Sequence, residues 1–488
     1  MSAFQSISEH LHSPAGTWEA WRQPSHYHPD LPVFKKAIER WVNDFHFRRD
    51  FEADPIGSLQ SYGLDIPVQD LQIMVNPELA KSFASDDPAT PLLVRQYRQF
   101  ISAKRRHCVD VRDAQPSHSG WRRWRQRMIN STFWREGPRK HAKLVHAPFS
   151  VELTQGCTVG CWFCGVDAAR FQGPVEVNAD TETIWIRMLT AFRNIAGRES
   201  AQHGFCYWAT DPLDHPEYEW FLEQFHDILG YWPQTTTAQV MKHPERVRKL
   251  LAHIKNRNSF VQRFSMIRSG DLDAIHEFFT AEELLLVELI PQYDDRLSPK
   301  ATAGRVRQLV LDRQSANKPI PIQYNLESTG SIACVSGFLV NLVQRSLKLI
   351  TPCLASDRWP LGYRVLGEQH FESPGQIEPL MLHMLDTCLT DRLHPDDHLH
   401  AFPGVRFGHV NGDRLCVTKH GYTCSIPGIS DPAQLADLLS ENGRSVADIC
   451  AARSGAGVDN LYTSITLNQL FDRGIFDEGL MDASRPSG

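Results

Sequence analysis

Strand-like and helix-like segments alternate between about residues 149 and 353, and this pattern restricts the possible folds more than any other feature. The segment FSVELT alternates, with Phe149, Val151 and Leu153 on one face. HGFCYWAT is a second apolar strand, and PEYEWFLEQFHDILG is a helix with Gly230 just past its end. Further predicted strands are TTTAQV, SFVQRFSMI, LLLVELI, PIQYNL and LKLITP. Such alternation is typical of a parallel sheet covered by helices.

The number of these units predicts an incomplete barrel. About six strand–helix units fit into the segment, fewer than the eight of a closed (β/α)8 barrel. Helices such as HPERVRKLLAHIK and TAGRVRQLVLDR separate the strands, and another helix is expected to begin at SIACVSGF. We therefore expect an α/β fold built on a partial (β/α)6 barrel.

The two ends of the chain have different patterns. Phe34, Ile38, Trp41 and Phe45 recur at helical spacing, which predicts a helical N-terminal region. Near the other end, VRFGHVNGDRLCV predicts a hairpin that turns at the Asn-Gly pair of residues 411–412. Three helices are expected after this hairpin. A hairpin followed by three helices suggests a small winged-helix-like α+β module.

A chain of 488 residues is too long for one ordinary core, so several regions are expected. We predict four regions, with boundaries set by these changes of pattern. They are an N-terminal helical region (1–110), a basic, Trp-rich connector (111–147), the partial barrel (148–375) and the C-terminal winged-helix-like module (376–488).

Charge and hydropathy exclude some classes of partner. The net charge of −6 does not favour nucleic acid. Basic clusters at residues 104–107 and 122–127 fit either a solvated face or an anionic partner. No run approaches the roughly 20 apolar residues of a membrane span, and the polar start MSAFQSISEH lacks a signal peptide's apolar core. We therefore expect a cytoplasmic protein with no membrane partner, in which the 11 cysteines do not form disulfides.

Only one group of cysteines is closely spaced. The segment GCTVGCWFCG, directly after the first predicted strand, contains Cys157, Cys161 and Cys164. Three thiolates on a short loop can bind three irons of a 4Fe–4S cluster and leave the fourth iron open. A structural zinc site would need a fourth ligand nearby, which this stretch lacks. The spacing therefore predicts one 4Fe–4S cluster.

This Cys-x3-Cys-x2-Cys motif, with Phe163 before the last cysteine, resembles the signature of the radical S-adenosylmethionine (SAM) superfamily. The resemblance implies that the open iron binds SAM, and that reduction releases a 5′-deoxyadenosyl radical. It also implies SAM contacts by Asp211, in the sequence ATDP of residues 209–212, and by Arg263 and Ser265 in a later strand. For Asp211, a helix N-cap is an equally good interpretation.

Further stretches, among them GFCYWATDPLDHPEYE, PQTTTAQ and LITPCLASDRWPLGY, resemble radical SAM peptide epimerases of the polytheonamide (proteusin) type. These belong to the RiPP maturation amino acid epimerase family. The likeness covers about residues 30–370, and FRRDFEADPIGSLQSYGLDIP is similar to a leader-like segment of such enzymes. It implies inversion of L-residues to D-residues in a precursor peptide, with an electron donor such as flavodoxin or ferredoxin. The C-terminal module is similar to modules that recognise leader peptides.

The same resemblance implies that a second cysteine returns hydrogen to the opposite face of the substrate radical. Cys353 and Cys334 are the candidates, with Cys353 preferred because it closes a predicted barrel strand. Cys206 is expected to be a packed core thiol, and the cysteines of the C-terminal module are expected to be ordinary thiols. The alternatives are another radical SAM peptide modification (methylation or a thioether crosslink) and a catalytically silent peptide-binding scaffold.

Overall fold

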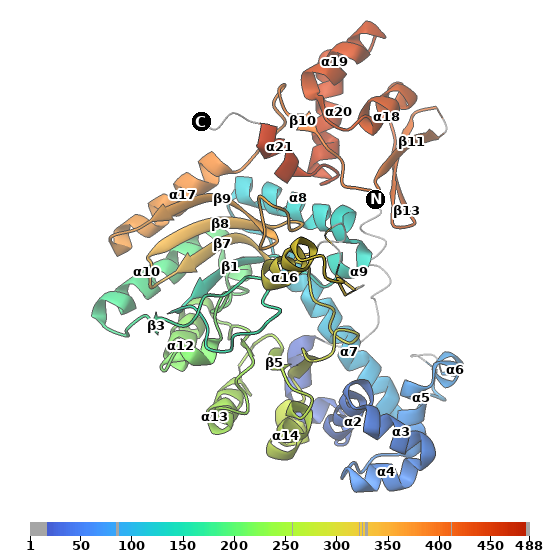
Figure 1. The fold of residues 1–488 in the computed structure, drawn as a ribbon, viewed down its shortest axis with the longest axis vertical. Helices are drawn as coiled ribbons and strands as arrows, with labels where there is room; N and C mark the ends of the chain where they lie inside the picture. Colours follow the sequence, from blue (N-terminus) through green and yellow to red (C-terminus); the bar gives the residue numbers. More distant parts are fainter. Residues whose placement is uncertain are drawn as a thin grey trace.

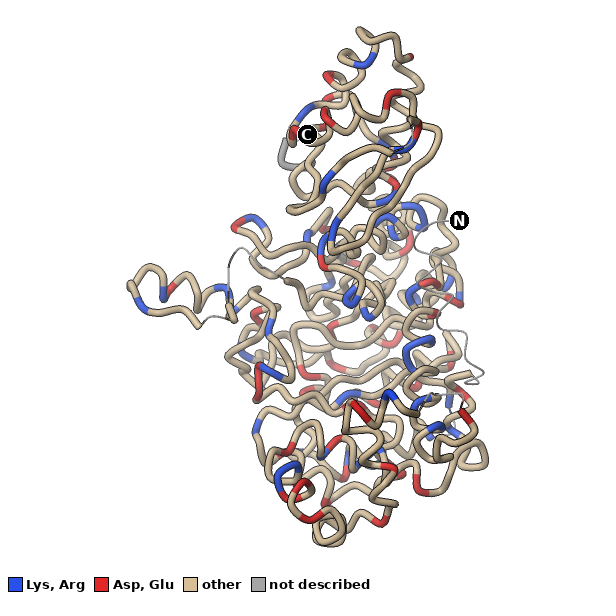
Figure 2. The backbone as a smooth tube through the Cα atoms, turned by 90° about the vertical axis from the view of Figure 1, so that its right-hand side faces the viewer, with Lys and Arg blue, Asp and Glu red and all other residues tan. Residues whose placement is uncertain are grey.

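Three parts follow one another along the long axis of the molecule (Figure 1). N-terminal helices lie at one end, an α/β region lies in the middle, and a C-terminal module lies at the other end. Basic and acidic positions are mixed along the chain (Figure 2). This computed structural model describes residues 17–83, 87–255, 257–321, 323–324, 326, 330–410 and 412–484.

Parallel pairing organises the α/β region. β1 (Ala147–Glu152) pairs in parallel with β7 (Val335–Asn341). β4 (Thr236–Thr237), β5 (Gln262–Met266) and β6 (Val287–Pro291) form a separate parallel sheet. In the described part of the chain these sheets do not close on each other. The α/β character is therefore observed, and the partial (β/α)6 barrel stays a prediction.

Two expected strands do not form. HGFCYWAT makes a single parallel bridge, between Ser150 and Phe205. The following backbone groups of this segment bind side chains of β1 instead of its backbone. The Ser150 hydroxyl donates to the Tyr207 carbonyl, and Glu152 accepts from the Ala209 amide. The described residues of PIQYNL form a turn instead of a strand. Its Pro321 has no amide hydrogen to give to a neighbouring strand.

The sheet of β1 and β7 grows in the antiparallel direction. β8 (Ser346–Pro352) pairs antiparallel with β7, and β9 (Tyr363–His370) pairs antiparallel with β8. LKLITP is therefore a strand as expected, but its place among the parallel barrel strands is wrong. The helix expected from SIACVSGF is also wrong, because this segment leads into β7. Gly337 lets β7 lie close to β1, since a Cβ there would be 1.9 Å from the Pro148 carbonyl oxygen.

Helices cover one face of these sheets and create the main core. Phe149 and Val151 of β1 face this core as predicted, and the Phe149 ring stacks on Phe192 with centroids 3.7 Å apart. The predicted stop of the second helix at Gly230 is confirmed by its left-handed φ of 79°. The helices of the α/β region are α10 (Ala179–Ala196), α11 (Arg198–Ala201), η3 (Pro212–Asp214), α12 (Tyr218–Leu229), α13 (Pro244–Ile254), α14 (Asp271–Phe278), α15 (Ala281–Leu284), α16 (Gly304–Ser315), η4 (Pro374–Gln376) and α17 (Ile377–Cys388).

The N-terminal region is helical, as predicted, and has its own core. Tyr231, Phe260 and Leu285 of the α/β region complete this core, so the two parts pack together. Phe45 does not share the helical face of Phe34, because α2 ends before it and its side chain is 66% exposed. The elements are η1 (Trp18–Arg22), η2 (Pro24–His26), α2 (Leu31–Asn43), α3 (Phe45–Ala53), α4 (Pro55–Ser61), α5 (Val68–Val75), α6 (Pro77–Ser82) and α7 (Leu92–Asp113).

The predicted basic connector is a buried helix. α8 (Ser119–Glu136) places Trp121 in the α/β core and Trp134 in the core of the C-terminal module, and α9 (Pro138–His141) follows it. Arg125 is fully buried and donates to the carbonyls of residues 145 and 146. Arg125, which belongs to the basic cluster at residues 122–127, therefore neither lies on a solvated face nor is available to an anionic partner.

A buried ion-pair group ties the C-terminal module to α8. Glu478 pairs with Arg127 at 2.5 Å and with Arg364 at 3.5 Å, and all three side chains are at most 6% exposed. Removing one member of such a group leaves an uncompensated buried charge. The last helix is therefore held to both α8 and β9.

The C-terminal module contains the predicted hairpin and helices. A third strand, β13, extends the hairpin, whose Asn411 lies outside the described residues. Ser445 caps its helix by accepting from the Asp448 amide at 3.0 Å, as expected. The elements are β10 (His398–Leu399), β11 (Arg406–Val410), β12 (Arg414–Lys419), β13 (Tyr422–Ile426), α18 (Pro432–Ser440), β14 (Arg444–Ser445), α19 (Val446–Gly455), α20 (Asn460–Asp472) and α21 (Glu478–Ser484).

Within the described ranges, no helix combines the length and the apolar character that crossing a bilayer requires.

Candidate active site

The three closely spaced cysteines lie on one loop beyond the C-terminal end of β1. A short antiparallel pair, β2 (Thr154–Gln155) and β3 (Gly173–Pro174), closes the base of this loop, and we call residues 156–172 the Cys loop. The Cys157 amide donates to the Ala169 carbonyl at 2.9 Å. Gly156 has a φ of 77°, and a Cβ there would meet the Arg170 carbonyl oxygen at 2.3 Å. Only glycine fits this turn without strain.

The sulfur atoms of the Cys loop receive hydrogen bonds from the backbone. The Val159 amide donates to Cys157 Sγ at 3.5 Å, and the Ala168 amide donates to Cys164 Sγ at 3.3 Å. Burial raises the pKa of Cys161 to about 11, and the neighbouring Cys157 and Cys164 thiols add to this rise. Two of the three sulfur atoms are thus hydrogen-bonded to the backbone of the loop itself.

The donor set of the Cys loop consists of thiols. Among the described residues, no three His, Cys, Asp or Glu side chains converge closely enough to bind one ion. A 4Fe–4S cluster holds its thiolates at separate corners, further apart than the ligands of a single ion, and thiolates are its usual protein ligands. Three thiols on one glycine-containing loop are compatible with such a group.

Helix α16 holds the Cys loop from the side. The Arg305 guanidinium donates to the Cys161 carbonyl at 2.8 Å and also to the Ala168 carbonyl, and its Nε donates to Asp167 at 3.0 Å. The Arg305 amide donates to the Cys164 carbonyl at 3.0 Å. This arginine was not identified from the sequence, because 144 residues separate it from Cys161.

Two more contacts join this region to the Cys loop. Gly304 has a φ of 54°, and a Cβ there would lie 2.4 Å from the Cys164 carbonyl oxygen, so α16 begins in close contact with the loop. The Lys300 ammonium lies 4.8 Å from the centre of the Phe163 ring. Lys300 and Arg305 each form an ion pair in this region, with Asp295 at 3.8 Å and with Asp167 at 3.0 Å.

Asp214 fixes the other side of the Cys loop. It accepts from the Thr158 amide at 2.8 Å and from the Thr158 hydroxyl at 2.6 Å. Gln239 donates to the same carboxylate at 2.7 Å. The sequence pattern suggested only that Asp214 lies near a helix start. The short spacing from Asp211 to Asp214 was the available signal that both carboxylates belong to one turn.

Asp211 is an N-cap, as one of its two interpretations predicted. Its carboxylate accepts from the Leu213 amide at 3.1 Å, the Thr237 hydroxyl at 2.8 Å and the Ala238 amide at 2.7 Å. Burial raises the pKa of Asp211 to about 6 against these hydrogen bonds. The SAM contact assigned to Asp211 by resemblance stays a prediction. Asp211 lies near the Cys loop, because Asp214 of the same turn binds Thr158 of that loop.

Arg263 and Ser265 lie on the same face of β5, as predicted, since their neighbours on either side are buried in the core. The Arg263 Nε donates to Glu288 at 3.0 Å. Arg263 also lines a cavity of about 260 Å³ whose wall includes Cys334. The structure thus brings Arg263 together with Cys334, at the end where the parallel strands begin.

One relative matches the chain over nearly its whole length. No family model and no solved structure matches the chain. The uncharacterized protein y4wI of Sinorhizobium fredii is 30% identical over 502 residues, which cover 99% of this chain and 94% of the relative. The chain belongs to the family of y4wI. Because the match spans nearly the whole of both proteins, the family combines all three parts of the molecule in one chain.

The two candidate hydrogen donors lie away from the Cys loop in this member of the y4wI family. Cys334 precedes β7 and Cys353 follows β8, so both lie at the edge where β1 begins. The reason given for preferring Cys353 is wrong, because β8 is antiparallel and its end is not at the mouth beside the Cys loop. Cys353 is 8% exposed and faces Phe402 and Phe476 of the C-terminal module across a small gap.

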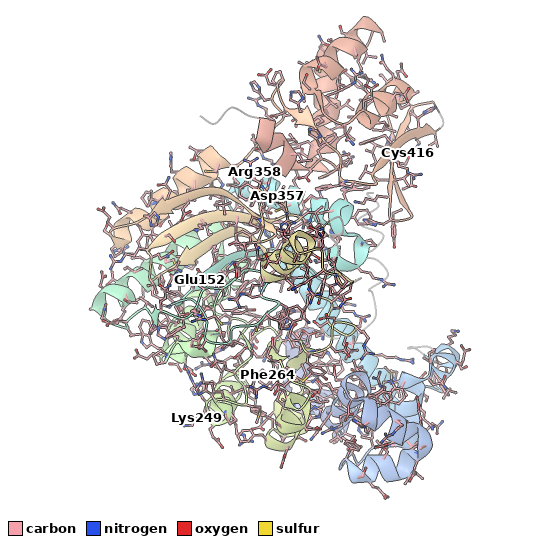
Figure 3. All side chains as sticks on the ribbon, viewed as in Figure 1. Glu152, Lys249, Phe264, Asp357, Arg358 and Cys416 are labelled. Atoms are coloured by element: carbon pink, nitrogen blue, oxygen red, sulfur yellow. The ribbon has the colours of Figure 1, made fainter. Side chains whose placement is uncertain are left out.

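One other cysteine lies in the main core, and three lie in the C-terminal module. Cys206 is 1% exposed and belongs to the main core, as predicted. Cys416 lies in the C-terminal module, apart from Glu152 on β1 (Figure 3). Cys424 and Cys450 pack against the core of the same module. The expectation of ordinary thiols in this module stays a prediction.

Proposed function

We propose that this protein is a radical SAM enzyme that converts L-residues to D-residues in a ribosomally made precursor peptide. The observation that carries the proposal is the Cys loop, which places three cysteines beyond the C-terminal end of β1. Cys157, Cys161 and Cys164 would hold one 4Fe–4S cluster, and SAM would bind its open iron. When bound, these groups would supply a 5′-deoxyadenosyl radical that removes the α-hydrogen of a substrate residue.

The chain's own residues prepare the loop for this role. Arg305 and Asp214 hold the loop from two sides through six hydrogen bonds. Arg305 makes four of them, to Cys161, Cys164, Asp167 and Ala168. Asp214 makes the other two, to the amide and the hydroxyl of Thr158. Such contacts keep the three thiols near one another before a cluster binds. Asp211, Arg263 and Ser265 remain the proposed contacts for SAM.

A thiol must return hydrogen to the opposite face for the configuration to invert. Both proposed donors, Cys334 and Cys353, lie at the edge where β1 begins and away from the Cys loop, and of these two Cys334 is the better candidate. It packs with Tyr207 and Trp208 on the sheet face away from the main core, and it lines the 260 Å³ cavity. Burial raises the pKa of Cys334 to about 11, so its thiol keeps its hydrogen at neutral pH. Cys353, the alternative, packs against the C-terminal module instead.

The cluster is tested first, by measuring iron, sulfide and SAM cleavage in anaerobically prepared protein. The wild type should contain about four irons and four sulfides per chain and should release 5′-deoxyadenosine. Cys161→Ala should lose both properties. Cys450→Ala, a partly exposed cysteine of the C-terminal module, is the control and should keep them. Retained SAM cleavage in Cys161→Ala would rule out the cluster.

The reaction is tested by co-expression with a precursor peptide gene, followed by chiral amino-acid analysis. In deuterated water each new D-residue should carry deuterium on its α-carbon, because a thiol exchanges hydrogen with solvent. Cys334→Ala should still cleave SAM but leave inversion incomplete. Loss of inversion only in Cys353→Ala would reverse the choice of donor.

Two other proposed functions are distinguished by the same products. A methylated or thioether-linked peptide would indicate another radical SAM modification, and an absence of SAM cleavage would favour a silent peptide-binding scaffold. The proposal includes a cytoplasmic location, where thiols stay reduced and flavodoxin or ferredoxin could supply the electron. The precursor peptide is the proposed partner, with no role for nucleic acid or a membrane.

A further inference from the structure

A polar cavity of about 140 Å³ lies next to the Cys loop, at the end of β1 and β7. Gly156 and Ala168 of the Cys loop form one side of it. Strand residues and two aromatic side chains form the other sides. The residues that matter for its chemistry are Glu152, Trp208, Asn341, Ser346, Lys348 and Tyr363.

The polar residues of this cavity occupy the face of the sheet that points away from the main core. Glu152 of β1, Asn341 of β7 and Ser346 of β8 alternate with core residues such as Val151, Val340 and Leu347. Polar side chains buried at such positions are costly unless they have partners. Their placement together at the edge beside the Cys loop therefore indicates a binding site more readily than a packing role.

Glu152 is a buried hydrogen-bond acceptor with capacity left. It is 9% exposed, and it accepts from the Ala209 amide at 2.9 Å and from Asn341 Nδ2 at 3.0 Å. A carboxylate offers about four acceptor positions, so about two remain on this residue, which lines the cavity. The nearest cation on the wall, Lys348, forms its ion pair with Glu368 at 3.3 Å.

Ser346 supplies a hydrogen-bond donor. Its side chain is fully buried, and its hydroxyl has no hydrogen-bond partner among the described residues. Leaving a buried hydroxyl without a partner is unfavourable. A ligand that accepts a hydrogen bond from Ser346 would remove this cost. Trp208 and Tyr363, edge to face with centroids 5.6 Å apart, provide an apolar wall for the ligand's carbon atoms.

A peptide group presents one N–H donor and one C=O acceptor, which matches an available acceptor at Glu152 and an available donor at Ser346. We infer that this cavity binds a backbone amide of the substrate peptide, with Glu152 accepting its N–H and Ser346 donating to its carbonyl. The inference deepens the proposed function and rests on it for the identity of the substrate. It makes Glu152 and Ser346 positioning residues that hold the peptide beside the Cys loop.

The experiment measures binding of N-acetyl-L-alanine N-methylamide, a blocked residue with two peptide groups, to the full-length protein by ligand-observed NMR. The wild type should bind it at millimolar concentrations. Ser346→Ala should weaken binding about fivefold, the effect of one neutral hydrogen bond, and Glu152→Gln about tenfold or more. Ser58→Ala is the matched control, because Ser58 is also buried with an unpartnered hydroxyl among the described residues, but lies in the N-terminal region.

Equal binding by Ser346→Ala and wild type, or no binding by the wild type, would overturn the inference. SAM is added as a second probe in the same titrations. If SAM displaces the blocked residue and Glu152→Gln weakens both equally, the cavity belongs to the cofactor and the inference is wrong. Failure of the proposed function is a different result, since it appears as missing iron and missing SAM cleavage while binding of the blocked residue is unchanged.

Discussion

Replacing Arg305 with alanine should loosen the Cys loop without unfolding the protein. The Arg305 side chain is 29% exposed and donates to two loop carbonyls, those of Cys161 and Ala168. A hydrogen bond from a charged donor contributes about 1.5–3 kcal/mol, and partial exposure favours the lower value for each. The exposed Asp167 pair adds little. The total is about 3 kcal/mol of lost loop stability.

This loss can be measured as the rate at which a reconstituted cluster gives up iron to a chelator. If iron leaves through an opened loop, about 3 kcal/mol corresponds to roughly 100-fold faster release. Arg313→Ala is the control, because Arg313 lies on the same helix and donates only to the exposed Pro319 carbonyl. Release from Arg305→Ala at the same rate as from Arg313→Ala would refute this account of the loop.

Three further predictions concern stability and the loop. Glu478→Gln should lower the free energy of unfolding in urea by about 3–5 kcal/mol, because two buried arginines lose their shared partner. Gly304→Ala should lower the iron content after reconstitution, because its Cβ would displace the loop carbonyl of Cys164. Burial alone would raise the pKa of Glu288, but Lys104 and Arg263 lower it to about 2. The contribution of the Glu288 carboxylate to the stability of the fold is therefore lost as the pH falls from about 4.3 towards 2. In unfolding titrations over that pH range, the free energy of unfolding should therefore fall by about 1.5 kcal/mol less in Glu288→Gln than in the wild type. This value is reduced because the Glu288 side chain is partly exposed to solvent.

The sequence pattern predicted elements more reliably than their directions. β1 and the helix ending at Gly230 follow from local periodicity and local turn chemistry, and both are found. The direction of β8 does not follow from its own residues. A useful signal was the connection between Asn341 and Ser346, because a parallel crossover needs a dozen or more residues and this link is far shorter.

The candidate site was predictable only in its sulfur atoms. The spacing of Cys157, Cys161 and Cys164 identifies the loop, because the ligands of one group are close together in sequence. Arg305 contacts the loop from a helix far along the chain, and nothing local to that helix indicates the contact. The same holds for Ser346, whose importance depends on lying beside β7.

Helix α8 has a consequence for how members of this family exchange parts during evolution. It precedes the α/β region in the chain, yet its Phe133 and Trp134 side chains complete the core of the module that follows that region. A single recombination event after β9 would transfer a foreign module without the helical surface that it fits. Productive chimaeras therefore require two segments, on either side of the α/β region, to be inherited together.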